Sequence, residues 1–210
     1  MVISELGNAA ADIVLIQPVD DHDLSLIKNE CRLIAGMTRA DFRLIAVGIG
    51  DWNSDLSPWK APAVFGHKDF GNGAERTLAA ILELCFDKSK RYYLGGYSLA
   101  GLFALWAAYQ TEVFRGVAAA SPSMWFPGFV GYMKEHTLRC GAVYLSLGDR
   151  EEKARNPVMA TVGDRIREAH QVLKERGIPC RLEWNEGNHF RDADVRTAKG
   201  FAYLLNIGQS

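Results

Sequence analysis

A serine flanked by small residues follows a short apolar run in the segment RYYLGGYSLAGLFALWAAY, residues 91–109. The run ends at Gly95 and Gly96, and a nearly unbroken apolar stretch begins just after Ser98. A strand, a tight turn with serine at its apex and a helix, in that order, are typical of a nucleophile elbow. The pattern therefore predicts that Ser98 is a nucleophile, whereas the plainer interpretation is an ordinary glycine-rich turn.

The residues two positions before and after a nucleophilic serine must be small, because the sharp turn brings them together. Gly96 meets this requirement fully, and Ala100 adds one methyl group where glycine is usual. The backbone N–H of Leu99, at the start of the helix, is expected to point towards a developing oxyanion. The helix N-terminus adds partial positive charge there, so Leu99 is the first predicted oxyanion donor.

A second oxyanion donor is expected from the loop after the first predicted strand, residues 17–20. Pro18 has no N–H group to offer. The position therefore favours the backbone N–H of Val19, or of a near neighbour, as the second donor.

A nucleophilic serine needs a base, and three histidines follow Ser98 in the chain. His136 lies in the charged helical stretch YMKEHTLR, and His170 lies beside the apolar stripe of a long amphipathic helix. His189 lies in the loop sequence NEGNHF, between the last predicted strand and the last predicted helix. A base on that loop would reach the sheet edge that carries Ser98, so His189 is the predicted base. The alternative is a polar loop histidine that caps the helix.

The residue that orients the base is expected after the predicted strand at 142–147, in the sequence LGDREEKARN. Hydrolases built on a parallel sheet covered by helices often place the acid three residues after the glycine that closes the strand, which is Gly148. This favours Glu151, with Asp149 next and Glu152 as the third carboxylate. A Ser–His dyad without an acid remains open, as does a solvated role for all three carboxylates at a helix start.

Short apolar strands alternate with helical patterns along the whole chain, which predicts a mostly parallel sheet with helices on both faces. Apolar residues recur at one-face helical spacing around residues 78–85, 159–173 and 195–205. In such sheets ligands bind at the carboxyl ends of the strands, where Ser98 falls. The six predicted strands cover residues 12–17, 43–48, 91–95, 116–120, 142–147 and 180–184.

Length and composition favour a single domain over residues 1–210, with a net charge of −1 that gives no reason to expect nucleic acid or an anionic membrane. The N-terminal sequence lacks a basic segment followed by a long apolar core, and no apolar run is long enough to span a bilayer. The four cysteines show no C-x-x-C pair, which favours free thiols and a reducing cytoplasm. The sequence says nothing about the oligomeric state.

Five sequence blocks together resemble one branch of the α/β-hydrolases, the esterases that include siderophore esterases of the ferric-enterobactin type, S-formylglutathione hydrolase and feruloyl esterases. They occur in the family's order and cover most of the chain. The block containing SPSMW is the most specific, since no general structural rule demands it. The blocks are VGIGDWNSDLSPW (47–59), GGYSLAGLFAL (95–105), FRGVAAASPSMWF (114–126), LSLGDREEKARN (145–156) and EGNHF (186–190).

The resemblance implies a single α/β-hydrolase domain with Ser98 as nucleophile, His189 as base and one carboxylate of the loop 148–152 as acid. Compared with the family, the chain is short and is expected to open directly at the third strand of the usual eight. The predicted sheet therefore has six strands and lacks the first two edge strands. No insertion long enough for a lid is seen.

The predicted activity is hydrolysis of a small-molecule ester or thioester through an acyl-enzyme, without a metal or an organic cofactor. One alternative is an acyltransferase that uses the same residues with an alcohol acceptor. A second is a non-catalytic binding protein that keeps the fold. Aromatic residues near strand ends are candidates for pocket walls or for ordinary core packing. They are Trp52, Trp59, Trp125 and Phe126.

Overall fold

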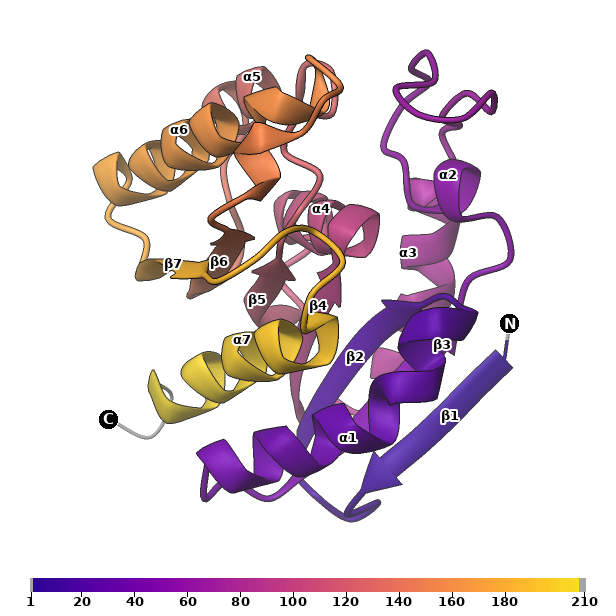
Figure 1. Cartoon of the computed structure of the whole chain (residues 1–210). Helices are drawn as coiled ribbons and strands as arrows, with labels where there is room; N and C mark the ends of the chain where they lie inside the picture. The colour runs from indigo at the N-terminus through magenta and orange to yellow at the C-terminus, as the bar shows by residue number, and fades with distance from the viewer. Residues whose placement is uncertain (1, 208–210) are drawn as a thin grey trace.

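The structure is a computed structural model that describes residues 2–207. These residues form one seven-stranded sheet with the order β1-β3-β2-β4-β5-β6-β7, in which only β1 runs antiparallel to its neighbour (Figure 1). The mostly parallel α/β sheet that the sequence predicts is thus confirmed. The strands are β1 (Val2–Gly7), β2 (Ile13–Val19), β3 (Phe42–Gly48), β4 (Arg91–Tyr97), β5 (Phe114–Ala120), β6 (Val143–Gly148) and β7 (Cys180–Asn185).

The predicted count of six strands is wrong, because β1 precedes them as an antiparallel edge strand paired with β3. The expectation that the sheet lacks both early edge strands is therefore wrong as well. Residues 2–7, VISELG, alternate between exposed and half-buried and include no fully buried residue. An edge strand that buries so little apolar surface leaves no apolar run in the sequence, so the strand signal was missing.

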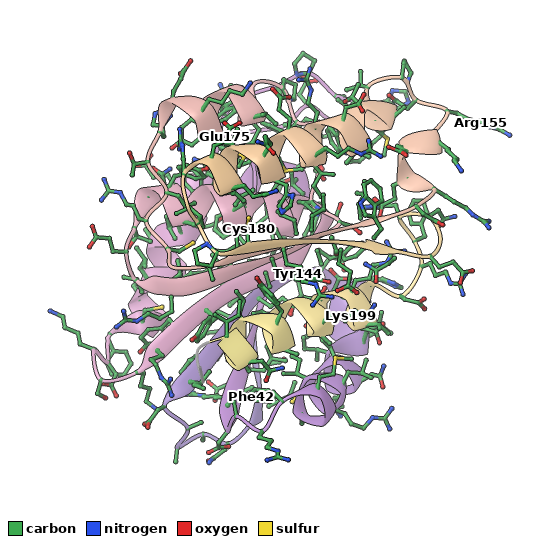
Figure 2. The ribbon with its side chains drawn as sticks, turned by 90° about the vertical axis from the view of Figure 1, so that its left-hand side faces the viewer. Phe42, Tyr144, Arg155, Glu175, Cys180 and Lys199 are labelled. Carbon is green, nitrogen blue, oxygen red and sulfur yellow. The ribbon has the colours of Figure 1, made fainter. Side chains whose placement is uncertain are left out.

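Helices cover both faces of the sheet, as the sequence predicts. On one face α1 (Asp21–Met37) and α7 (Ala193–Ile207) lie side by side and share a core with the strands (Figure 1). The other face carries a larger core made by α3 (Ala74–Leu82), α4 (Ser98–Gln110), α5 (Phe129–Glu135) and α6 (Val162–Glu175). In Figure 2 the sheet lies between α6, which ends at the labelled Glu175, and α7, which carries Lys199.

Four short elements complete the described chain: the one-turn helix α2 (Trp52–Asp55) and 3-10 turns at Glu83–Cys85, Glu151–Lys153 and Met159–Thr161. The four cysteines have free thiols, with Cys140 buried. Within residues 2–207, no helix combines the length and the apolar character needed to cross a membrane.

Helix α4 is buried on all sides, which explains its almost entirely apolar sequence. Its N-terminus packs directly on the end of β4. A methyl group added at Gly101 would lie 2.9 Å from the backbone oxygen of Gly96, so only glycine allows this approach. A methyl group added at Gly96 would lie 2.6 Å from Cβ of Ala100. The close contact between positions 96 and 100 explains why both must be small, and why alanine still fits at the second.

We expect Gly96→Ala to lower the free energy of unfolding by about 1–3 kcal/mol, because the new methyl group overlaps Ala100. The measurement is urea unfolding followed by circular dichroism. Gly36→Ala is the matched control, since nothing lies within 4 Å of a methyl group at that position on α1. A Gly96→Ala protein as stable as the control would contradict the crowded elbow.

A buried glutamate lies between β2 and α1, on the face opposite to α4. Glu30 is 2% exposed, and Nε2 of Gln17 donates to its Oε2 at 3.2 Å. No partner within residues 2–207 bonds its Oε1. Burial raises the pKa of Glu30 well above its usual value, against the smaller lowering effect of the Gln17 bond. The carboxyl group of Glu30 therefore holds its proton to higher pH in the folded protein than in the unfolded chain.

Because folding raises the pKa of Glu30, the folded state holds more protons than the unfolded state above about pH 4.5, the unfolded value. Stability from this group is thus complete below pH 4.5 and is lost as the pH rises through the folded pKa. We expect Glu30→Gln, which does not titrate, to be more stable than wild type at pH 8 by about 1–3 kcal/mol and no more stable at pH 4. Urea unfolding at both pH values measures this, with the exposed Glu135→Gln as control. A difference that does not change with pH would be evidence against a buried, titrating Glu30.

Candidate active site

Ser98 stands at the point where β4 ends and α4 begins, with φ of 56° in the left-handed region. This conformation is costly for a residue other than glycine and persists only where the surroundings impose it. The packing of α4 on β4 imposes it here. The turn leaves Ser98 half-exposed while its neighbours Tyr97 and Leu99 are buried. The hydroxyl is thus presented at the carboxyl edge of the sheet.

His189 lies on the loop between β7 and α7, and its Nε2 is 2.9 Å from Oγ of Ser98. Its Nδ1 is 2.7 Å from Oε2 of Glu151. An ionised carboxylate can only accept a hydrogen bond, so Nδ1 must carry the proton. In neutral His189 the Nε2 atom is then free to accept the proton of Ser98. The hydroxyl of Tyr97 donates to the backbone oxygen of His189 at 2.8 Å and so ties the β7–α7 loop to the end of β4.

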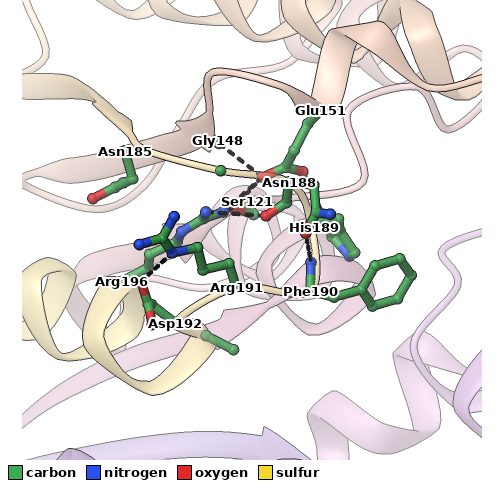
Figure 3. Close-up of polar contacts among 12 residues, drawn as sticks. Ser121, Gly148, Glu151, Asn185, Asn188, His189, Phe190, Arg191, Asp192 and Arg196 are labelled. Atoms are coloured by element: carbon green, nitrogen blue, oxygen red, sulfur yellow. Dashed lines mark hydrogen bonds and ion pairs between the residues drawn. The ribbon is translucent and has the colours of Figure 1, made fainter.

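Glu151 begins a 3-10 turn after β6, and its side chain is only 4% exposed. Its second oxygen, Oε1, accepts from the backbone N–H of Gly148 at 2.7 Å, from Oγ of Ser121 at 2.8 Å and from Nη1 of Arg196 at 2.8 Å (Figure 3). Burial alone would raise the pKa of Glu151. The hydrogen bond and charge of His189, with the Gly148 and Ser121 donors, together outweigh burial and hold that pKa below its usual value.

The two other carboxylates of this loop point elsewhere. Oδ1 of Asp149 accepts from the backbone N–H of Gly187 at 2.8 Å, and Glu152 pairs with Arg167 at 2.8 Å. Of the three carboxylates that the sequence offers, Glu151 is the one bonded to the imidazole. The structure brings Ser98, His189 and Glu151 into one hydrogen-bonded row, and their catalytic roles remain predictions.

Leu99 is the second residue of α4, so its backbone N–H is among the first four of the helix, which have no intrahelical acceptor. Val19 is the last residue of β2, the strand next to β4. Its carbonyl accepts from the N–H of Ile49 at 3.0 Å, which ties it into the β2–β3 ladder. Both predicted oxyanion donors therefore lie at the carboxyl ends of adjacent strands, and their roles are likewise predictions.

Sequence reasoning missed several residues that support this row. Arg196 comes from α7, and Ser121 comes from the end of β5 with φ of 41°. Ser123 lies next to Ser98: its N–H donates to the backbone oxygen of Ser98 at 3.1 Å, and the two Oγ atoms are 3.4 Å apart. Ser121 and Ser123 are the two serines of the SPSMW block. Their contacts with Glu151 and Ser98 give a structural reason for this block, which no general rule of folding demands.

Most aromatic residues considered for the pocket are packed in the core. Trp59 stacks with Phe129 and meets Phe126 edge to face, at ring-centroid distances of 6.2 and 5.7 Å. Trp125 and Phe126 are buried. Trp52 is half-buried on α2. Trp59 is therefore packed against the core, whereas Trp125 and Phe126 are buried and also line a pocket beside Pro157 and Arg165.

No protein-family model and no curated protein matches the chain. Solved structures do match it. The siderophore hydrolase EstA from Aspergillus nidulans is 23% identical, with a TM-score of 0.63 over 96% of this chain and 85% of that one. An IroE-like serine hydrolase from Shewanella oneidensis is 13% identical, with a TM-score of 0.74 over 97% of this chain and 75% of that one. A ferulic acid esterase is 14% identical, with a TM-score of 0.64 over 94% and 85%.

Identities this low establish the fold and no more. The resemblance to α/β-hydrolase esterases that the sequence indicates is confirmed at that level. The chain has the α/β-hydrolase fold that these esterases and hydrolases share.

Proposed function

We propose that this protein is a carboxylic ester hydrolase in which Ser98 is the nucleophile, His189 the base and Glu151 the acid. One observation carries the proposal: Glu151, His189 and Ser98 are joined by hydrogen bonds of 2.7 and 2.9 Å at a strained elbow. The structural neighbours support it, because their names describe a siderophore hydrolase, a serine hydrolase and a ferulic acid esterase. The substrate class is a small-molecule ester.

In the first half of the reaction, Oγ of Ser98 attacks the ester carbonyl carbon while Nε2 of His189 takes the hydroxyl proton. Glu151 holds Nδ1–H and stabilises the imidazolium that forms. The carbonyl oxygen becomes an oxyanion, which the N–H groups of Leu99 and Val19 stabilise, each worth about 3–4 kcal/mol in comparable sites. The carbon–oxygen bond to the leaving alcohol then breaks, and the imidazolium gives its proton to that alcohol.

In the second half, His189 takes a proton from water, and the resulting hydroxide attacks the acyl group on Ser98. Collapse of the second oxyanion breaks the bond to Oγ, which recovers its proton from the imidazolium. The carboxylic acid leaves and the free enzyme returns. An acyltransferase would place an alcohol where this water acts, so product analysis with added alcohol separates the two activities.

We expect the purified protein to hydrolyse p-nitrophenyl esters, and Ser98→Ala and His189→Ala each to reduce kcat by several orders of magnitude. A fluorophosphonate probe should label wild type at Ser98, as read by peptide mass spectrometry. Ser54→Ala, which changes a serine outside the row, is the control and should retain labelling. A folded wild-type protein that neither hydrolyses the esters nor takes the label is a non-catalytic member of this fold.

We expect Glu151→Gln to reduce kcat by about 10⁴-fold, because a neutral amide can stabilise the wrong tautomer of His189 and cannot balance the imidazolium. Glu152→Gln is the matched control on the adjacent position. Its side chain pairs with Arg167 and should be replaceable with little effect on kcat. Steady-state kinetics on one p-nitrophenyl ester compares both variants with wild type. Equal rates for wild type and Glu151→Gln would leave a Ser–His dyad as the working site.

A further inference from the structure

One buried arginine contacts every segment that supplies the candidate triad. Arg196 is 1% exposed and projects from α7 towards Glu151 and the loop that carries His189 (Figure 3). We propose that Arg196 is a positioning residue that locks the acid, the base loop and the nucleophile strand together and widens the active pH range on the acid side. This inference rests on the proposed function.

The first set of contacts fixes the acid. Nη1 of Arg196 donates to Oε1 of Glu151 at 2.8 Å and to Oγ of Ser121 at 3.0 Å. Ser121 itself donates to the same Oε1 at 2.8 Å. A carboxylate held through one oxygen by these donors cannot rotate freely. Its other oxygen, Oε2, is thereby kept in line with Nδ1 of His189.

The second set of contacts fixes the loop that carries the base. Nη2 of Arg196 donates to the backbone oxygens of Glu186 and Asn188 at 3.1 and 3.0 Å. These residues flank Gly187, whose φ of 104° is open only to glycine. The loop bends around the guanidinium at this point and then delivers His189. The position of the base therefore depends on an arginine seven residues later in the chain.

A third contact reaches the nucleophile strand. Nη1 of Arg196 shares its two N–H groups with a third acceptor, the hydroxyl of Tyr97 at 3.1 Å, and that hydroxyl donates to the backbone oxygen of His189 at 2.8 Å. Tyr97 is the residue before Ser98 and the last of β4. The same cation thus spans the end of β4, the turn after β6 and the loop after β7.

Only an arginine can make these contacts at once, because its planar fork directs two nitrogens at separate acceptors. The site closes tightly around that fork. A methyl group added at Gly148 would lie 3.0 Å from both Nη1 and Nη2. A lysine at position 196 could keep the charge beside Glu151, but its single nitrogen could not also hold both loop carbonyls.

The charge of Arg196 acts on the pair formed by Glu151 and His189. A buried cation beside the pair opposes the uptake of a proton by either partner. The reaction needs both partners without that extra proton, so the cation preserves activity as the pH falls. Removing it makes protonation of the pair easier, and the acid limb of the pH–rate profile must move to higher pH.

Other titratable groups also face the pair. Asp23 on α1 lies near His189 and His22, and burial raises its pKa to about 6. Burial also raises the pKa of Tyr97 to about 12. Asp149 lies beside the loop through its bond to Gly187. These groups are the same in wild type and in variants at position 196, so a difference between their pH profiles reports the arginine.

The test compares wild type with Arg196→Met and Arg196→Lys. The variable is kcat against pH, with rates divided by the concentration of sites labelled by fluorophosphonate. We expect Arg196→Met to move the acid limb up by about 1 pH unit and to lower kcat by about 100-fold. Arg196→Lys should leave the acid limb in place while kcat still falls, because the charge is kept and the fork is lost. If Arg196→Met yields too little folded protein, Arg196→Gln is the neutral variant.

The control is Arg191→Met. It removes an exposed arginine of the same loop, whose side chain pairs with Glu186. It should leave the acid limb and kcat unchanged. A purely structural arginine would change the fraction of labelled sites but not the pH profile of those sites. An acid limb of Arg196→Met that coincides with that of wild type therefore overturns the proposal.

A second readout separates this proposal from the proposed function, because it needs no substrate. ¹⁵N NMR titration of the His189 side chain, assigned by comparison with His189→Ala, follows protonation of the pair directly. The midpoint should be higher by about 1 pH unit in Arg196→Met than in wild type. If wild type hydrolyses no ester yet this shift appears, only the proposed function fails. If wild type is active and the midpoint does not move, only the role of Arg196 fails.

Discussion

The candidate site depends on keeping a carboxylate charged where water scarcely reaches it. The side chain of Glu151 is 4% exposed, and burial by itself favours its neutral form. Four donors oppose that tendency: the backbone of Gly148, Ser121, Arg196 and the imidazole of His189. Because these donors come from different strands and loops, the charge on one carboxylate requires the carboxyl edge of the sheet to be assembled as a unit.

This requirement links the fold to the chemistry. The parallel strands β4, β5, β6 and β7 are neighbours in the sheet, and each contributes a residue or a loop at the same edge. β4 supplies Ser98 through the elbow, and β5 supplies Ser121. The segments after β6 and β7 supply Glu151 and His189. Helix α7 packs on the face of the sheet opposite to α4. Its Arg196 reaches the carboxyl edge of the sheet and bonds Glu151 there.

Residues with local signals could be predicted from the sequence, and those with only long-range partners could not. The elbow around Ser98 and the loop that carries His189 have the spacing of a strand–turn–helix pattern. For the acid, comparison with hydrolases favours Glu151 and leaves Asp149 and Glu152 open. The helix of residues 162–175 also falls where one-face apolar spacing predicts a helix. By contrast, the partners of Arg196 lie 8 to 99 residues away in the chain. Nothing in the sequence around position 196 indicates them.

The strand β1 shows the same limit in the fold. Its half-exposed residues pair with β3 through the backbone, and backbone pairing leaves no side-chain pattern to detect. The packing of Trp59 also depends on distant partners, Phe129 in α5 and Phe126 in the loop before it. Sequence alone could offer both a pocket wall and core packing for Trp59 and could not choose between them.

The central claim is that Ser98 forms a covalent acyl intermediate, and intact-protein mass spectrometry after rapid acid quench tests it most directly. After mixing with a p-nitrophenyl ester, wild type should show a mass increase equal to the acyl group, located on the peptide that contains Ser98. Ser98→Ala should show none. Ester hydrolysis by wild type with the adduct on another residue, or hydrolysis retained in full by Ser98→Ala, would contradict the account.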